Sequence, residues 1–389
     1  MNAADREWMH RALMLADCGR FTADPNPRVG CVIVRDGREV GAGVHWRAGE
    51  AHAEVNALQA AGEAARGATV YVSLEPCNHH GRTPPCTEAL IAAGVGRVVI
   101  AMEDPDPRVC GGGADRLRAA GIAVETGLLE AEARALNPGF VQRMERGRPW
   151  VRIKSAISLD GRTAMASGES QWITGEAARN DVQLWRARAG AILTGSGTVL
   201  ADDPQLNVRR SPTELAAAAG LPESPRLADL PVRQPLRLIV DSGLRTPPTA
   251  RILQGSPTWV LTTESAAAGP AADVLRGRGA DLIVLPGAAE DAAGHLDLQA
   301  LLAELHTREI NELHVEAGPG LAGALARAGL VDEWLVYQAP LLLGSGGRPM
   351  VDWDIGRMAE RAELEVVESR WLGETLRLRA LPRGVPNSL

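Results

Sequence analysis

Cysteine is scarce in this chain, and long apolar runs are absent. The five cysteines are odd in number and all lie within the first 110 residues, which makes a poor disulfide framework and indicates thiols kept reduced in a cytosol. No apolar run reaches the roughly 18 residues of a membrane-spanning helix. The N-terminal stretch carries acids and polar groups where a signal peptide needs an apolar run. We therefore expect a cytoplasmic protein that is neither exported nor inserted in a membrane.

Positive charge and aromatic side chains are also in short supply. The 389 residues include 41 basic and 48 acidic ones, a net charge of −7, and Lys154 is the only lysine. This balance gives the surface no electrostatic drive toward a nucleic-acid backbone, so we expect small-molecule partners and no nucleic acid. Aromatics make up only 3%, but 45% hydrophobic and 23% charged residues are typical of a globular protein. At roughly 100–200 residues per domain, the length predicts two or three domains.

Helical and strand-like patterns alternate along both halves of the chain, which predicts an α/β fold in each. A polar stretch with Gly and Pro at 143–149 separates them, and it predicts a first domain at 1–147 and a second at 148–389. The pattern from Glu130 to Glu145 predicts one helix. The Pro- and Ala-rich stretch from Arg210 to Gln234 has little periodicity and is predicted to be a surface excursion.

The first half holds a set of residues with the chemistry of a metal site. His52 opens a predicted helix, and Cys77 and Cys86 follow a predicted strand. One imidazole and two thiolates give zinc three ligands and leave a fourth position for water, as in catalytic sites. Glu54, two residues from His52, is placed to carry a proton to a leaving amine, which predicts hydrolytic deamination.

Two other interpretations of these residues stay open. The motif of zinc deaminases places two residues between the cysteines, whereas eight separate them here. Cys77, His79, His80 and Cys86 would instead make a closed structural zinc site, as in a nucleotide-responsive binding protein for which Glu54 is dispensable. A tRNA adenosine deaminase shares the ligand pattern but needs a basic docking face. The remaining thiols are interpreted as packing or loop residues: Cys18, Cys31 and Cys110.

The second half contains a glycine-rich turn between a predicted strand and a predicted helix. Gly318 to Gly323 matches G-x-G-x-x-G in that context. Bare amides and the positive end of the helix dipole suit a phosphate group there. No acidic residue ends a strand about 20 residues later, so we reject a Rossmann domain. A turn with only a packing role remains an alternative.

Several segments together resemble a known family. NPRVG at Asn26–Gly30, HAE at His52–Glu54 and PCNHHGRTPPC at Pro76–Cys86 resemble the deaminase half of the bifunctional riboflavin-biosynthesis deaminase/reductases. VRIKSAISLDGRTAMASGESQW at 151–172, LTGSGTVLADDPQLNVR at 193–209 and VEAGPGLAGALARAGLVDE at 315–333 resemble the reductase half. The resemblance spans nearly the whole chain. It implies a cytidine-deaminase-like layered α/β domain followed by a dihydrofolate-reductase-like α/β domain, and a homo-oligomer.

The resemblance also implies two successive reactions. The deaminase half removes the 2-amino group of a diaminopyrimidinone ribosylamine 5′-phosphate, with zinc on His52, Cys77 and Cys86 and with Glu54 as the proton shuttle. Asn26 contacts the ring or belongs to an ordinary turn. The reductase half uses NADPH to reduce the ribosyl group of the deaminated product to ribityl.

Site residues of the reductase half follow from the same resemblance. NADPH is expected to contact Ala156, Trp172, Thr198, Asp202, Ser242, Gly318, Pro319, Gly320, Leu321, Ala322, Gly323 and Ala324. The substrate is expected to contact Ser170, Arg186, Leu206, Arg209 and Glu316, since the planar guanidinium of arginine binds phosphate through two parallel hydrogen bonds. Lys154 is a candidate proton donor or substrate clamp. Asp160 is either a turn residue or a catalytic one.

Overall fold

The computed structural model describes residues 1–79, 84–107, 109–222, 224–288 and 295–383. The chain divides into two compact units. The first combines Met1–Gly147 with Ser211–Val232, and the second combines Arg148–Arg210 with the described residues from Arg233 onward. The sequence-based division leaves Ser211–Val232 in the second domain, whereas in the structure this segment packs with the first unit. No helix among the described residues is both long and apolar enough to cross a bilayer.

The first unit is built on a five-stranded sheet in the order β2-β1-β3-β4-β5. The strands are β1 (Gly30–Arg35), β2 (Arg38–Val44), β3 (Thr69–Val72), β4 (Arg97–Ile100) and β5 (Ala123–Thr126). β1 runs antiparallel to β2 and β3, while β3, β4 and β5 are parallel. Asp36 and Gly37 join β1 to β2 with positive φ at both residues, as the tight hairpin turn requires.

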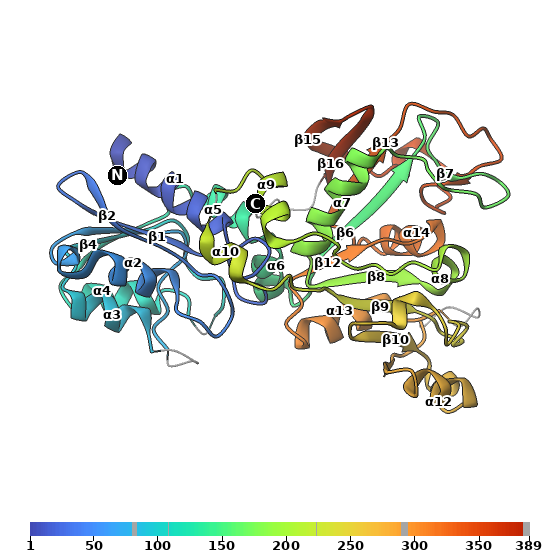
Figure 1. Cartoon of the computed structure of the whole chain (residues 1–389), viewed down its shortest axis with the longest axis horizontal. Coiled ribbons are helices and arrows are strands. Elements are labelled where there is room, and N and C mark those ends of the chain that lie inside the picture. The colour runs from blue at the N-terminus through green and yellow to red at the C-terminus, as the bar shows by residue number, and fades with distance from the viewer. Residues whose placement is uncertain (80–83, 108, 223, 289–294, 384–389) are drawn as a thin grey trace. The chain divides into compact units, whose positions relative to one another are not determined.

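Helices cover both faces of this sheet. The helices of this unit are α1 (Ala3–Asp17), α2 (Ala53–Ala61), η1 (Gly62–Ala65), α3 (Cys86–Ala93), α4 (Gly112–Ala119), α5 (Glu130–Leu136) and α6 (Pro138–Arg146), and the added segment Ser211–Val232 contributes α9 (Pro212–Ala218) and α10 (Pro225–Asp229). Figure 1 shows α1 and α5 on one face and α2, α3 and α4 on the other. α2 lies so close to β2 that a Cβ added to Gly43 would stand 2.1 Å from the Ala53 carbonyl oxygen. Only glycine fits at this position.

One sequence prediction for this unit was wrong. The expected helix from Glu130 to Glu145 is two helices that meet at Asn137, because Pro138 lacks an N–H and begins the second one. The stretch predicted to be a surface excursion contains two short helices, α9 and α10. Both begin with proline at the first turn, and Ser211 caps α9 with a complete capping box.

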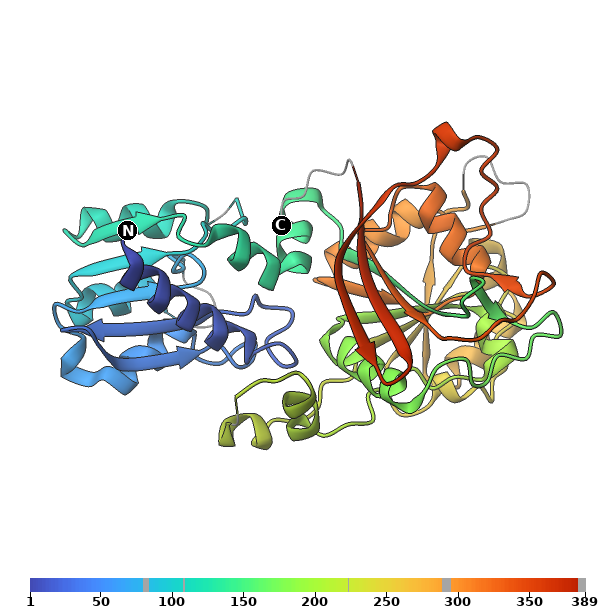
Figure 2. The same cartoon turned by 90° about the horizontal axis from the view of Figure 1, so that it is seen from above.

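The second unit is built on a nine-stranded sheet in the order β11-β10-β9-β8-β12-β6-β13-β16-β15. Its strands are β6 (Trp150–Ile157), β8 (Ala191–Gly195), β9 (Leu236–Val240), β10 (Thr258–Thr262), β11 (Ala280–Val284), β12 (Glu312–Val315), β13 (Glu333–Gln338), β15 (Leu364–Leu372) and β16 (Thr375–Pro382). β7 (Arg162–Ala164) and β14 (Arg348–Pro349) form a separate pair. The sheet is parallel up to β13, and the hairpin β15–β16 adds an antiparallel edge, seen at the red end of the chain in Figure 2.

Helices pack on both faces of the second sheet as well. The helices of this unit are α7 (Glu176–Arg188), α8 (Ser196–Asp202), η2 (Arg251–Leu253), α11 (Glu264–Ala267), α12 (Pro270–Arg276), α13 (Leu298–Thr307), α14 (Pro319–Arg327) and η3 (Met358–Glu360), of which α11 and η3 have no buried residue. α13 and α14 share one apolar core with β6, β8 and β12, and α7 packs in a second core with β13. Burying these apolar faces stabilises each layer by roughly 25 cal/mol per Å² removed from water.

Candidate functional site

Three metal-ligand side chains meet at the start of two helices in the first unit. His52 precedes α2, Cys77 lies in the loop after β3, and Cys86 is the first residue of α3. The Sγ atoms of Cys77 and Cys86 lie 3.6 and 3.3 Å from Nδ1 of His52. All three ligand atoms lie within 4.8 Å of one another. The structure therefore brings the predicted zinc ligands together.

This donor set fits zinc. Bonds of roughly 2.0–2.3 Å from one ion reach nitrogen and sulfur atoms spaced in this way. Among the described residues no further His, Cys, Asp or Glu joins the group. His79 is exposed and outside it, and His80 lies outside the described residues. The described part of the chain thus offers three ligands, as in the open sites of zinc hydrolases.

Glu54 lies in the first turn of α2, beside the ligands, and is 3% exposed. Burial raises its pKa to about 7, although the positive charge of His52 opposes this. A hydrogen bond from the Cys86 thiol lowers the pKa of Cys77 well below its ordinary value. A thiolate beside a carboxyl group that holds a proton near neutrality is a suitable pair for binding a metal and for moving a proton.

Asn26 is linked to the same site by His45, a residue that was not predicted from the sequence. Asn26 contacts His45, and His45 contacts the zinc ligand His52. Nδ2 of Asn26 lies 3.0 Å from Nε2 of His45, and the His45 ring stands edge-on to the His52 ring with centroids 5.1 Å apart. Burial lowers the pKa of His45, which favours the neutral imidazole. His45 directly follows β2 and lies seven residues before His52 in the sequence, which is a weak signal because a histidine in such a place equally fits a core position.

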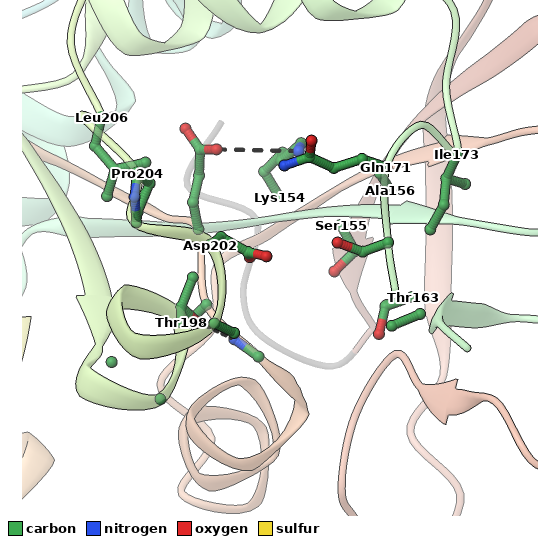
Figure 3. A pocket seen from close by; sticks show the side chains of 18 of the residues that line it. Lys154, Ser155, Ala156, Thr163, Gln171, Ile173, Thr198, Asp202, Pro204 and Leu206 are labelled. Carbon is green, nitrogen blue, oxygen red and sulfur yellow. Dashed lines mark hydrogen bonds and ion pairs between the residues drawn. The ribbon is translucent and has the colours of Figure 1, made fainter. Parts of the chain in front are cut away.

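The second unit contains a cavity of about 690 Å³ at the ends of β6, β8 and β12. Figure 3 shows Lys154, Ala156, Thr198, Asp202 and Leu206 around it. Most predicted site residues line this cavity: Lys154, Ala156, Ser170, Trp172, Arg186, Thr198, Asp202, Leu206, Arg209, Glu316, Gly318, Pro319, Gly320 and Leu321. The predicted residues between positions 154 and 321 therefore come from several segments that border the same cavity.

Five predicted residues do not line the cavity. Gly323 packs against backbone instead, because a Cβ there would stand 2.2 Å from the Asp352 carbonyl oxygen. The carboxylate of Asp160 accepts hydrogen bonds from the Ser158 hydroxyl and from the amides of Leu343 and Gly344, so it braces a turn. The other three are Ser242, Ala322 and Ala324.

The glycine-rich turn meets the α8 segment at the cavity. Gly318 is the N-cap of α14, and Pro319 occupies its first turn. The amide of Gly318 donates to Oγ1 of Thr198 at 3.2 Å. The first amides of a helix lack partners within the helix, and this helix start lies on the wall of a cavity large enough for a cofactor, which fits the pyrophosphate of a dinucleotide.

Charged side chains on the cavity wall form one network. Arg186 makes a two-pronged ion pair with Glu316, at 2.6 Å from Nε and 3.0 Å from Nη2. Nζ of Lys154 lies 4.0 Å from Glu316, the contact drawn dashed in Figure 3. Burial opposes ionisation of Glu316, but the charges of Arg186 and Lys154 hold its pKa well below the usual range. Burial also lowers the pKa of Lys154.

Sequence reasoning missed several basic lining residues. Arg179, Arg251 and Arg348 line the cavity, and the Arg179 guanidinium lies 4.5 Å from the centre of the Trp172 ring. With 41 basic residues of which all but one are arginine, no single arginine stands out in the sequence. Only their common position in the fold identifies them.

Comparisons with known proteins agree with both sites. Residues 2–102 match the cytidine and deoxycytidylate deaminase zinc-binding region, and residues 149–377 match the RibD C-terminal domain. The riboflavin biosynthesis protein RibD of Escherichia coli (strain K12) is 51% identical over 372 residues, which cover 95% of this chain and 97% of that protein.

Solved structures give the same result. Acinetobacter baumannii RibD, form 1, is 44% identical with a TM-score of 0.86, and the match covers 97% of this chain and 99% of that one. A diaminohydroxyphosphoribosylaminopyrimidine deaminase/5-amino-6-(5-phosphoribosylamino)uracil reductase from Thermotoga maritima is 31% identical with a TM-score of 0.80, at the same coverage.

Fold and sites define the chain as a zinc deaminase joined to an NADPH-dependent reductase. More particularly, the chain belongs to the RibD family of bifunctional riboflavin-biosynthesis enzymes. The predicted fold class, an α/β deaminase domain followed by an α/β reductase domain, is confirmed. The whole-length match favours this function over the tRNA adenosine deaminase and binding-protein alternatives.

Proposed function

We propose that residues 1–147 deaminate a diaminopyrimidinone ribosylamine 5′-phosphate and that residues 148–389 then reduce its ribosyl group to ribityl. The observation that carries the first step is the group of His52, Cys77 and Cys86 with buried Glu54 beside it. Bound zinc supplies the Lewis acidity that activates water against the amino-bearing ring carbon. The Glu54 carboxyl group takes the proton from that water and returns it to the leaving amine.

The cavity of the second unit supports the reduction step. NADPH bound there supplies the hydride equivalent for the sugar carbon. The amides at the start of α14 and the side chains of Thr198 and Asp202 are placed to hold the dinucleotide. Ser242 stays a prediction here, because its side chain does not line the cavity.

Substrate binding is assigned to the basic corner of the same cavity. Arg209 is exposed there, and its guanidinium donates to the Asn207 side chain at 3.3 Å. Glu316 holds Arg186 in a fixed orientation. We assign Arg209 and Arg186 to the substrate phosphate, Ser170 and Leu206 to the same subsite, and Lys154 to the reacting end of the sugar.

Incubation of the whole protein with the diaminopyrimidinone ribosylamine phosphate tests this order of steps. Ammonia and NADPH oxidation are followed separately, with and without NADPH. Ammonia release without NADPH, followed by oxidation only after NADPH is added, supports the proposal. NADPH oxidation before any ammonia release would reverse the order.

A homo-oligomer is part of the proposal, and the outer strand of the second sheet supports it. β15 ends the sheet and exposes Leu364, Val366, Val367 and Trp371, with Trp371 67% exposed. Long apolar edge strands are usually covered, and a second copy of this chain is the proposed cover. Light scattering on the wild type and on Val366→Lys tests it. A monomeric wild type would contradict it.

We also propose that the enzyme works in the cytoplasm. All five thiols are free in the structure, and the two zinc-binding ones need reducing conditions to stay available to the metal. Cell fractionation with activity assays checks this, and activity confined to an exported fraction would contradict it.

A further inference from the structure

A buried glutamate lies two residues before the zinc ligand Cys77. Glu75 is 3% exposed and has no place in the mechanism above. Its Oε1 accepts two backbone hydrogen bonds at 2.9 and 3.0 Å, and its Oε2 accepts two more at 3.0 and 3.2 Å. The four donors are the amides of Asp104, Gly111, Gly113 and Ala114. A carboxylate with four N–H partners ties together segments far apart in the sequence.

Three of these donors belong to the start of α4. The N-cap residue of this helix, Gly111, has no side chain to accept from the first turn. The first amides of a helix lack partners within the helix, and the helix dipole adds a positive potential there. Glu75 supplies both the missing acceptors and the negative charge. It therefore caps α4 from a different part of the chain.

Backbone packing strengthens this link. A Cβ on Gly113 would stand 2.0 Å from the carbonyl oxygen of Pro76, so the peptide before Cys77 lies directly on the first turn of α4. On its other side, Cys77 is held by α3. The amide of Cys86 donates to its Sγ at 3.4 Å, and the amide of Thr87 donates to its carbonyl at 3.3 Å.

We propose that Glu75 is a positioning residue of the zinc site. By fixing the loop to α4, it holds Cys77 at the distance from His52 and Cys86 that one ion requires. Without this anchor, the loop must be ordered when the metal binds, and that cost lowers the affinity. The inference rests on the proposed zinc site but concerns the affinity for the metal, which is measured without any substrate.

The variant Glu75→Gln tests this role, since its amide nitrogen cannot accept from two of the four donors. Zinc affinity is measured by competition with a chromophoric chelator on the full chain. We expect it to weaken about 10- to 100-fold, the range seen when supporting partners of metal ligands are lost. NADPH-dependent reduction of the deaminated substrate is expected to stay unchanged. Excess zinc should restore ammonia release.

Asp5→Asn is the matched control. Asp5 is also a buried carboxylate of the first unit, but it binds Arg97 and Tyr71, away from the zinc loop. Its replacement lowers the stability of the unit and should leave the zinc affinity unchanged. Equal losses of affinity in both variants would reduce Glu75 to a general stabilising residue and overturn the proposal.

If Glu75→Gln does not fold, a second variant tests the proposal. Gly113→Ala keeps the carboxylate but pushes against Pro76, and it should weaken zinc binding in the same direction. Wild-type affinity in whichever of the two variants folds would overturn the inference. Zinc bound by the wild type without ammonia release from the substrate would instead overturn the proposed deamination, and would leave the role of Glu75 standing.

Discussion

The two sites of this chain are assembled in different ways. The zinc site takes its three ligands from two short stretches, 52–54 and 77–86, at the starts of α2 and α3. The reductase cavity takes its lining from segments spread between residues 154 and 348. A few residues with irreplaceable chemistry define the first site, whereas shape and many partial contributions define the second. We therefore expect single substitutions to abolish activity at the zinc site but to reduce activity only partly at the reductase cavity.

The largest expected effect is on the proton shuttle of the first site. Glu54→Gln keeps the shape of the side chain but cannot transfer the proton, and we expect ammonia release to fall about 10²- to 10⁴-fold. Zinc content, measured by mass spectrometry, should stay at the wild-type level, and NADPH oxidation with deaminated substrate should be unaffected. Ammonia release within fivefold of the wild type would show that another group carries the proton.

In the second unit, we expect the largest effect of a substitution to be on the free energy of unfolding rather than on the reaction rate. Glu333 is 1% exposed and binds Arg152 and Arg379 at 2.8 and 2.6 Å. Arg152 is itself fully buried, so Glu333→Ala leaves a buried charge with one partner fewer. We expect this to destabilise the unit by about 3–5 kcal/mol. Chemical denaturation followed by tryptophan fluorescence measures it.

A matched surface pair provides the control for that experiment. Glu304 and Arg308 are four residues apart on α13 and are partly exposed. Glu304→Ala should cost no more than about 0.5 kcal/mol, because solvent screens such pairs. Similar losses in the two variants would show that burial of the Glu333 network adds nothing.

The same network predicts how the second unit responds to acid. Burial raises the pKa of Glu333, but the charges of Arg152 and Arg379 outweigh this and hold it well below the ordinary value. Near pH 4 the unfolded chain then binds more protons than the folded one, so stability is present above about pH 4.3 and is lost as the pH falls further. Denaturation midpoints between pH 7 and pH 3 measure this. A flat profile below pH 4 would contradict it.

A moderate effect is expected at the basic corner of the cavity. Arg209→Ala removes a charged donor assigned to the substrate phosphate, a contact worth about 1.5–3 kcal/mol. We expect kcat/KM for the deaminated substrate to fall roughly 10- to 100-fold, with the KM for NADPH unchanged. Arg210→Ala is a suitable control, since Arg210 does not line the cavity. A rise in the KM for NADPH alone would move Arg209 to the cofactor.

The difference between the sites also explains what the sequence could predict. His52, Cys77, Cys86 and Glu54 were found because few residue types bind zinc or move protons, so their spacing is informative. His45 and Glu75 act through hydrogen bonds that only the folded chain creates. The hairpin β15–β16 was not predicted, although its strands flank a Gly-Glu turn, because the alternation of helical and strand-like patterns does not extend to it. The break between α5 and α6 could have been predicted, because Pro138 cannot continue a helix.

The smallest expected effect is that of Ser242 on NADPH binding. It tests whether the family resemblance or the cavity geometry better identifies the residues that contact the cofactor. Ser242 was assigned to NADPH from a short motif, but its side chain lies outside the cavity lining, and its carbonyl accepts from the hydroxyls of Thr262 and Thr263. Ser242→Ala keeps that carbonyl, so we expect the KM for NADPH to change less than twofold. Thr198→Ala, at the amide of Gly318, should raise it severalfold. A larger effect at Ser242 would show that the cofactor reaches beyond the cavity described.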